Sequence, residues 1–140
     1  MHEELIWQCY TQNELESIQL VSNRINSLPV PFAIYLEGDV GAGKTFFCQQ
    51  IARLNDEDNL TSSSFLNFNI YLGKHKIIHV DYYYNDRSNR FFYENIFEEI
   101  DENTILLSEW CPEYFDLRIT QFILKIVAEH DKRKISFYSL

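Results

Sequence analysis

The chain has 140 residues, the length of one ordinary domain, and its 46% hydrophobic content is enough to bury a core. Its 12 Lys and Arg against 21 Asp and Glu give a net charge of −9. Nucleic acids are held mainly by basic side chains on phosphates, so tight direct binding of nucleic acid is not expected. No apolar run approaches a membrane span and no signal-peptide pattern opens the chain, so we expect a cytoplasmic protein with one domain, residues 1–140.

The first predicted elements are a helix, a strand and a second helix. Residues 11–14 (TQNE) fit a capping box, in which a Thr hydroxyl and a Glu carboxylate satisfy free N–H groups at a helix start. Apolar residues then recur at helical spacing and stop before Pro29: Leu15, Ile18, Val21, Ile25 and Leu28. The apolar run 32–36 predicts a buried strand, and residues 46–54 predict the second helix.

The second half of the chain is dominated by short strand patterns. In chain order these patterns predict strands at 65–71 and 76–80 joined by a turn at 73–74, a helix at 92–100, a strand at 104–107, a long strand at 122–128, a turn at 131–134 and a returning strand at 135–138. Strands before and after helices predict an α/β sandwich whose C-terminal strands are antiparallel.

A phosphate-binding loop lies between the first predicted strand and the helix that follows it. Residues 38–45 (GDVGAGKT) match G-x-x-x-x-G-K-[ST], and three of the four glycines of the chain lie in them. Glycines let backbone N–H groups curl around phosphate oxygens, and the following helix points its positive end at the anion. Lys44 is expected at the β- and γ-phosphates and the Thr45 hydroxyl on Mg²⁺. We expect a three-layer P-loop NTPase sandwich with a mixed sheet.

The remaining nucleotide contacts come from the rest of this loop. They are expected from Asp39, Val40, Gly41, Ala42 and Gly43. An ordinary Gly-rich turn would not need Lys and Thr at its end, which favours the phosphate-binding interpretation.

Two carboxylates follow apolar strands and could complete a metal site. Glu109 follows 104–108 and Asp81 follows 77–80, each where a strand leaves the core. For either one alone, an exposed loop carboxylate is the equal alternative. His79 is more typical of a satisfied core residue than of a catalyst, and Trp110 of packing than of nucleotide contact.

The three cysteines give no sign of a disulfide or a zinc site. Cys9, Cys48 and Cys111 are odd in number, far apart, and include no C-x-x-C pair. Buried or half-buried thiols are expected instead.

Four segments in this order and spacing resemble the TsaE (YjeE) family, bacterial ATPases that support synthesis of threonylcarbamoyladenosine in tRNA. These are the loop 38–45, residues 62–65 (SSSF) for the family's S-P-T-[FY], residues 79–83 (HVDYY) for its H-x-D-x-Y, and residues 109–110 for its E-W. The similarity runs from about residue 11 to residue 110. The chain departs from the family pattern with Ser63 for Pro, Ser64 for Thr, and Tyr84 for the Arg that follows H-x-D-x-Y.

The resemblance implies ATP and Mg²⁺ at the loop and assigns further roles. Glu109 would complete the metal site, and Asp81 would orient or activate water at the γ-phosphate. Ser64 would stand in a switch-like loop, and Trp110 would lie close to the nucleotide. The implied partner is the TsaB–TsaD pair, which transfers the threonylcarbamoyl group, so tRNA would be met only through partners. ATP hydrolysis would reset that complex between turnovers.

Two other functions fit a phosphate loop. A small-molecule kinase would close an Arg-bearing lid, for which the short segment 85–90 is poor material. A nucleotide-binding switch would bind without useful hydrolysis. Phosphate release only with partners would support the ATPase, a phosphorylated metabolite the kinase, and binding without turnover the switch.

Overall fold

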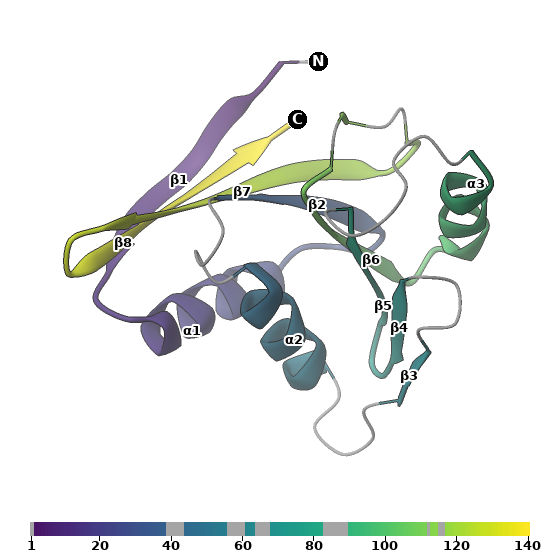
Figure 1. Cartoon of the computed structure of the whole chain (residues 1–140), viewed down its shortest axis with the longest axis horizontal. Helices are drawn as coiled ribbons and strands as arrows, with labels where there is room; N and C mark the ends of the chain where they lie inside the picture. The colour runs from purple at the N-terminus through teal and green to yellow at the C-terminus, as the bar shows by residue number, and fades with distance from the viewer. Residues whose placement is uncertain are drawn as a thin grey trace.

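The computed structural model describes residues 2–38, 44–55, 61–63, 68–82, 90–111, 113–114 and 117–140. This part of the chain forms an eight-stranded sheet in the order β1-β8-β7-β2-β6-β5-β4-β3, with three helices (Figure 1). The elements are β1 (Glu4–Thr11), α1 (Glu14–Ile25), β2 (Phe32–Glu37), α2 (Lys44–Asn55), β3 (Thr61–Ser63), β4 (Asn69–Leu72), β5 (Lys76–Asp81), α3 (Arg90–Glu99), β6 (Thr104–Glu109), β7 (Thr120–Glu129) and β8 (Lys132–Ser139).

The sheet is mixed, with a parallel centre and antiparallel margins. β2 runs parallel to both β6 and β7, and β5 runs parallel to β6. β8 pairs antiparallel with β7 and β1, and β4 pairs antiparallel with β5 and β3. The predicted α/β fold with a mixed sheet and antiparallel C-terminal strands is therefore confirmed. Because β2, β5 and β6 are parallel, their carboxyl ends meet at one edge of the sheet.

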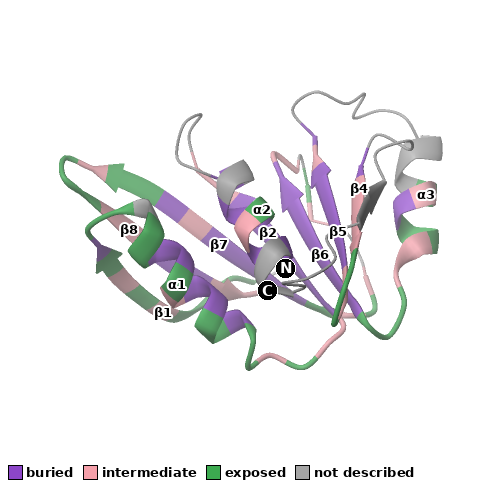
Figure 2. Cartoon of the chain, turned by 90° about the horizontal axis from the view of Figure 1, so that it is seen from below, coloured by how far each residue is buried: buried purple, intermediate pink, exposed green. Residues whose placement is uncertain are grey.

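Helices cover both faces of the sheet, which gives the three layers. α1 and α2 lie side by side on one face, while α3 lies beside β5 and β6 (Figure 1). The first core joins Val21, Phe47 and Ile34, and the second joins Ile96, Ile78 and Leu106. Along β2, alternate residues enter the two cores because strand side chains point to opposite faces. The central strands are buried along most of their length (Figure 2).

The start of α1 differs from the predicted capping box. Asn13 is the N-cap, and its side-chain oxygen accepts from the Glu16 N–H at 2.9 Å. The Glu16 carboxylate accepts from the backbone N–H of Gln12 at 2.9 Å. The reciprocal cap thus lies two residues beyond the predicted start, because Thr11 belongs to β1 and its hydroxyl contacts that of Ser17. α1 ends at Ile25, earlier than expected, and Leu28 packs on the core from outside the helix.

Two further differences lie on the antiparallel strands. β1 was not predicted, and it pairs with β8 along most of its length. The predicted turn at 131–134 is wrong, since β8 begins at Lys132 and the chain turns at His130 and Asp131. His130 has a φ of 46°, the left-handed conformation that a tight turn uses. Of the predicted strand 65–71, residues 69–71 lie in β4, and residues 65–67 fall outside the described part.

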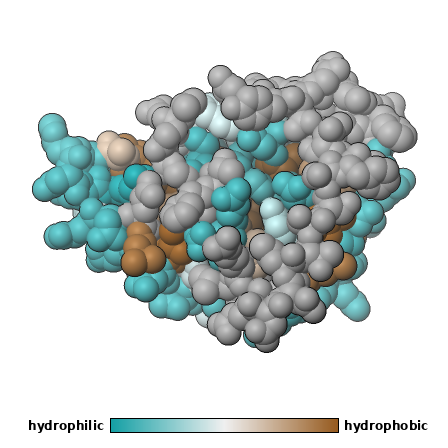
Figure 3. Space-filling model, turned by 60° about the horizontal axis from the view of Figure 1, so that its bottom comes forward, coloured by the Kyte–Doolittle hydropathy of each residue, from teal (hydrophilic) through white to brown (hydrophobic). Residues whose placement is uncertain are grey.

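On the face that Figure 3 shows, the described residues are mostly hydrophilic, with hydrophobic atoms in separate areas. Exposed large apolar side chains include Leu5, Ile6 and Tyr10 on the edge strand β1 and Val127 on β7. Among the described residues, no helix has the length and apolar character needed to cross a membrane.

Candidate phosphate and metal site

The candidate site lies at the sheet edge where β2, β5 and β6 end. Residues 38–43 connect the end of β2 to Lys44, the first residue of α2, which is the strand–loop–helix order that phosphate binding needs. Of the predicted phosphate-binding residues, Asp39–Gly43 fall outside the described part. Thr45 lies in the first turn of α2, but its side chain is not described, and Ser64 also falls outside the described residues.

Lys44 is buried and makes two contacts beside the loop. The residue is only 5% exposed, and its ammonium donates to the Gly38 carbonyl oxygen at 2.5 Å. The same ammonium lies 4.2 Å from the centroid of the Trp110 ring, within the range of a cation–π interaction. Trp110 follows β6 directly and has a φ of 58°. The fold thus brings the predicted phosphate-binding lysine and the predicted nucleotide-proximal tryptophan into contact.

Glu109 is a buried carboxylate held by a histidine of the neighbouring strand. It is 1% exposed, and its Oε2 lies 2.5 Å from His79 Nε2. A buried carboxylate is costly unless a partner compensates for the lost water, and His79 on β5 supplies that partner. Asp81 stands in register with Glu109 and is half-buried. The two predicted strand-end acids therefore lie side by side.

Cys48 joins these side chains from the helical layer. It lies one helical turn after Lys44 on α2, and it is fully buried. Its sulfur and the ligand atoms of His79 and Glu109 all lie within 4.8 Å of one another. Burial, and then the negative charges of Glu109 and Asp81, raise the pKa of the Cys48 thiol well above its ordinary value, although Lys44 opposes this shift. All three cysteines are free, with Cys48 buried and Cys9 and Cys111 half-buried, as the prediction of buried or half-buried thiols has it. Sequence spacing gave no sign of this cluster.

A cavity of about 300 Å³ opens beside Lys44 on the same edge. The rings of Tyr35, Trp110 and Tyr114 line it, together with Glu37 at the end of β2. The Tyr114 hydroxyl donates to Glu37 Oε1 at 2.5 Å. Burial and this neighbouring carboxylate raise the pKa of Tyr114. The cavity therefore combines aromatic surface with a fixed negative charge.

A second hollow, of about 580 Å³, lies between the start of α1 and the β7–β8 turn. Its lining includes Asn13, His130, Lys132 and Arg133. β7 is parallel to β2, so this turn lies at the same edge of the sheet as the phosphate loop. Two basic side chains from the segment predicted as a turn, Lys132 and Arg133, thus line a concave surface.

The family model "Threonylcarbamoyl adenosine biosynthesis protein TsaE" matches residues 11–135. The chain belongs to the TsaE family. Its relatives include the "tRNA threonylcarbamoyladenosine biosynthesis protein TsaE" of Rickettsia prowazekii (strain Madrid E), which is 33% identical over 111 residues, or 75% of this chain and 76% of that protein. The protein with the same description from Rickettsia felis (strain ATCC VR-1525 / URRWXCal2) is 35% identical over 101 residues, or 70% of this chain and 58% of that protein.

A solved structure shares the fold. The crystal structure of Bacillus subtilis YdiB superimposes with a TM-score of 0.65 at 22% identity, covering 99% of this chain and 88% of that one. The predicted TsaE resemblance is confirmed by the family match, and the predicted P-loop fold agrees with the order of β2 and α2 on either side of the loop sequence.

Proposed function

We propose that this TsaE-family chain binds and hydrolyses ATP with Mg²⁺ and so serves tRNA threonylcarbamoyladenosine synthesis through the TsaB–TsaD complex. The observation that carries the proposal is that Lys44, at the start of α2, and the two strand-end acids lie near one another at one edge of the sheet, where the charges of all three act on Cys48. A lysine for phosphates and a nearby carboxylate for Mg²⁺ are the protein groups that P-loop phosphoryl transfer requires.

The residues at this edge of the sheet suit the binding of ATP together with Mg²⁺. ATP and Mg²⁺ supply the transferable phosphoryl group and the charge that neutralises it. Lys44 leaves the Gly38 carbonyl and the Trp110 ring and binds the phosphates with the backbone of residues 39–43. Glu109 and the Thr45 hydroxyl hold Mg²⁺, for which oxygen ligands are preferred.

The neighbouring residues orient these groups. Asp81 ends the strand beside Glu109 and orients the attacking water. His79 fixes the Glu109 carboxylate through Nε2 and acts as a positioning residue. Trp110 lies against the bound nucleotide once Lys44 has moved, and Ser64 responds to the γ-phosphate from a switch-like loop.

The nucleoside has room in either of the two hollows along this edge. The aromatic cavity adjoins Trp110, and the basic hollow contains Arg133. The position of the nucleoside can be found by comparing the affinity for ATP with the affinity for inorganic tripolyphosphate, which lacks the nucleoside. A Trp110→Ala or Arg133→Ala change that weakens ATP but leaves tripolyphosphate unaffected identifies the hollow that holds it.

The partner requirement follows from charge and from the residues present in the motifs. A net charge of −9 disfavours direct tRNA binding, so a partner holds the RNA. The family's Arg after H-x-D-x-Y is Tyr84 here. An Arg supplied in trans accelerates related reactions by roughly 10³-fold or more. Hydrolysis by the isolated chain is therefore slow and is stimulated by TsaB–TsaD.

The test is a phosphate-release assay in which the chain, TsaB, TsaD and tRNA are omitted in turn, beside a tRNA gel-shift with the free chain. We expect strong stimulation by TsaB–TsaD and negligible tRNA binding at physiological salt. Fast hydrolysis by the lone chain, or a salt-resistant tRNA shift, contradicts the proposal. A phosphorylated metabolite instead of free phosphate would establish the kinase alternative.

A further inference from the structure

Three side chains from three separate elements meet between α2 and the sheet. Cys48 comes from α2, His79 from β5 and Glu109 from β6. Their sulfur, nitrogen and oxygen ligand atoms lie within 4.8 Å of one another, and all three residues are buried. Ligand atoms around a tetrahedral Zn²⁺ lie roughly 3.5 Å apart, given bond lengths of about 2.0–2.3 Å. Around such an ion, the widest separation of up to 4.8 Å would shorten and the 2.5 Å contact between His79 Nε2 and Glu109 Oε2 would open, each by about 1 Å.

The histidine has a nitrogen to offer. His79 Nε2 is engaged with Glu109, while His79 Nδ1 is buried and has no hydrogen-bond partner within the described residues. Most buried side-chain polar atoms have a partner, so this nitrogen calls for an explanation. A cation bound directly to Nδ1 would satisfy this nitrogen.

The donor set selects the cation. Mg²⁺ prefers oxygen ligands and has little affinity for a thiol or an imidazole. A sulfur, an imidazole nitrogen and one carboxylate oxygen suit Zn²⁺ and related first-row ions, and three protein ligands leave a fourth position open.

We propose that Cys48, His79 and Glu109 form a second metal site, which binds one Zn²⁺-type cation and is separate from the Mg²⁺ site at Thr45 except for the shared Glu109. On binding, the thiol proton of Cys48 leaves to solvent and the thiolate sulfur bonds to the metal. The site needs no nucleotide, because none of its three ligands belongs to residues 38–43.

The shared carboxylate couples the two sites, a consequence that rests on the proposed function. With Glu109 turned to Zn²⁺, Mg²⁺ loses its proposed protein carboxylate, so Zn²⁺ and Mg²⁺–ATP exclude one another. Zn²⁺ would then act as an inhibitor that works from behind the nucleotide site.

Cobalt provides a direct readout that does not involve ATP. Metal-free full-length chain, kept reduced without thiol reagents, is titrated with Co²⁺ and equilibrated for hours because the ligand atoms are buried. We expect one Co²⁺ per chain with a thiolate-to-cobalt charge-transfer band and tetrahedral ligand-field bands. Zn²⁺ should displace the Co²⁺, and a large excess of Mg²⁺ should not.

Variants assign the ligands. Cys48→Ser should abolish the charge-transfer band and weaken Co²⁺ by more than the roughly 10–100-fold typical of an outer-shell partner. Cys9→Ser is the matched control and should retain both. His79→Gln should weaken Co²⁺ binding while the band of any remaining complex persists. Thr45→Ala should leave Co²⁺ binding intact while weakening Mg²⁺-dependent ATP binding, which separates this site from the proposed ATPase site.

Other results would overturn the proposal. Co²⁺ spectra without a thiolate band, or a band that survives Cys48→Ser and disappears in Cys111→Ser, would exclude the cluster. If Cys48→Ser fails to fold, X-ray absorption on the unsubstituted Co²⁺ complex decides the question. One sulfur in the first coordination shell supports the site, and none rules it out. If the unsubstituted chain binds Co²⁺ as expected but shows no ATPase activity with TsaB–TsaD, the proposed function is refuted and the metal site is not.

Discussion

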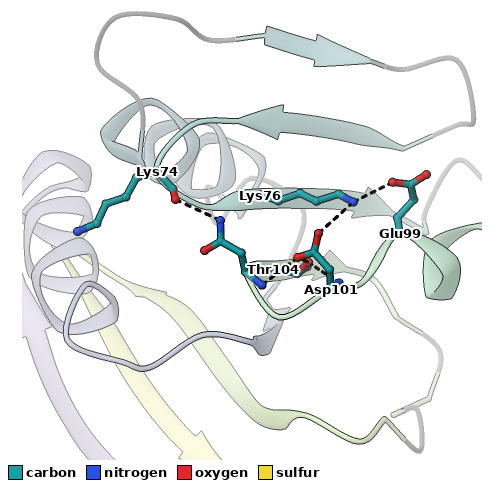
Figure 4. A network of polar contacts seen from close by, with 6 residues as sticks. Lys74, Lys76, Glu99, Asp101 and Thr104 are labelled. Atoms are coloured by element: carbon teal, nitrogen blue, oxygen red, sulfur yellow. Dashed lines mark hydrogen bonds and ion pairs between the residues drawn. The ribbon is translucent and has the colours of Figure 1, made fainter.

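Strands β5 and β6 carry a polar cluster at each end, and the two clusters differ in how far they are exposed to solvent. At the amino ends, Lys76 forms ion pairs with Glu99 at 3.0 Å and Asp101 at 3.8 Å, near solvent (Figure 4). Toward the carboxyl ends, His79 on β5 and Glu109 on β6 form a pair that is almost fully buried.

The exposed cluster is fully explained by local structure. Asp101 accepts from the Asn103 N–H and the Thr104 hydroxyl, each at 2.9 Å, and so closes the turn into β6. Asn103 in turn donates to the Lys74 carbonyl, which fastens this turn to the β4–β5 hairpin (Figure 4). Exposed ion pairs of this kind contribute about 0–1 kcal/mol each.

The buried cluster is costlier to maintain than the exposed one. Placing a carboxylate inside the protein carries a desolvation penalty of several kcal/mol, which the attraction to a partner often fails to exceed. Here one imidazole nitrogen also stays without a partner in the described structure. A group kept at this cost is better explained by ligand binding than by stability, and the two ends of the same strand pair should respond differently to mutation.

The largest difference is expected from neutralising one carboxylate at each end. Glu109→Gln should lower TsaB–TsaD-stimulated phosphate release by roughly 10²-fold or more, the cost of losing one electrostatic group at the reacting phosphates, and remove the Mg²⁺ dependence of ATP binding. Glu99→Gln, at the exposed end, should leave both unchanged. Equal effects of the two changes would show that burial of Glu109 has no functional meaning.

Lysine substitutions sharpen the same comparison at the level of binding. Lys44→Ala should weaken ATP binding measured by calorimetry by roughly 10–100-fold, the equivalent of about 1.5–3 kcal/mol for a charged hydrogen bond. Lys76→Ala removes an equal charge from the exposed cluster and should not alter the affinity. Unchanged affinity in Lys44→Ala would refute the phosphate-loop assignment.

A smaller, spectroscopic effect should report the movement of Lys44. In a Trp7→Phe background, Trp110 is the remaining tryptophan of the chain, and the Lys44 ammonium lies over its ring. A nucleotide analogue that draws Lys44 away should change the Trp110 emission, and Lys44→Ala should shift the spectrum before nucleotide is added. An emission spectrum indifferent to both would favour packing as the role of Trp110.

The fold could be predicted where one segment carries enough information by itself. The buried strands β2, β5 and β6 are compact apolar runs, and the helices α1 and α2 show helical spacing of apolar residues. β1 escaped prediction because it is an edge strand whose side chains are mostly exposed or half-buried, and its apolar run spans only residues 5–7. Its hydrogen bonds come from β8, at the other end of the chain, which no local pattern reveals.

The candidate site could likewise be predicted from the sequence only in part. Glu109 and Asp81 could be predicted because strand ends in a parallel sheet share an edge, and the register Asp81↔Glu109 brings them together. The Cys48–His79–Glu109 cluster could not be predicted, since its members lie about thirty residues apart on three elements. Contact between them depends on how α2 packs over β5 and β6, which spacing along the chain does not encode.

The smallest predicted effect concerns the exposed end and its dependence on pH. The hydrogen bonds from Asn103 and Thr104, and then the Lys76 charge, hold the pKa of Asp101 below its ordinary value of 3.8. A pKa that is lower in the folded chain gives stability that is present above the unfolded value and lost as the pH falls through the folded one. Asp101→Asn keeps an acceptor oxygen and removes the charge. Urea unfolding should therefore show a loss below about 1 kcal/mol at neutral pH, vanishing in acid. A difference that grows toward low pH would mean that the Asp101 charge does not stabilise this end of the sheet.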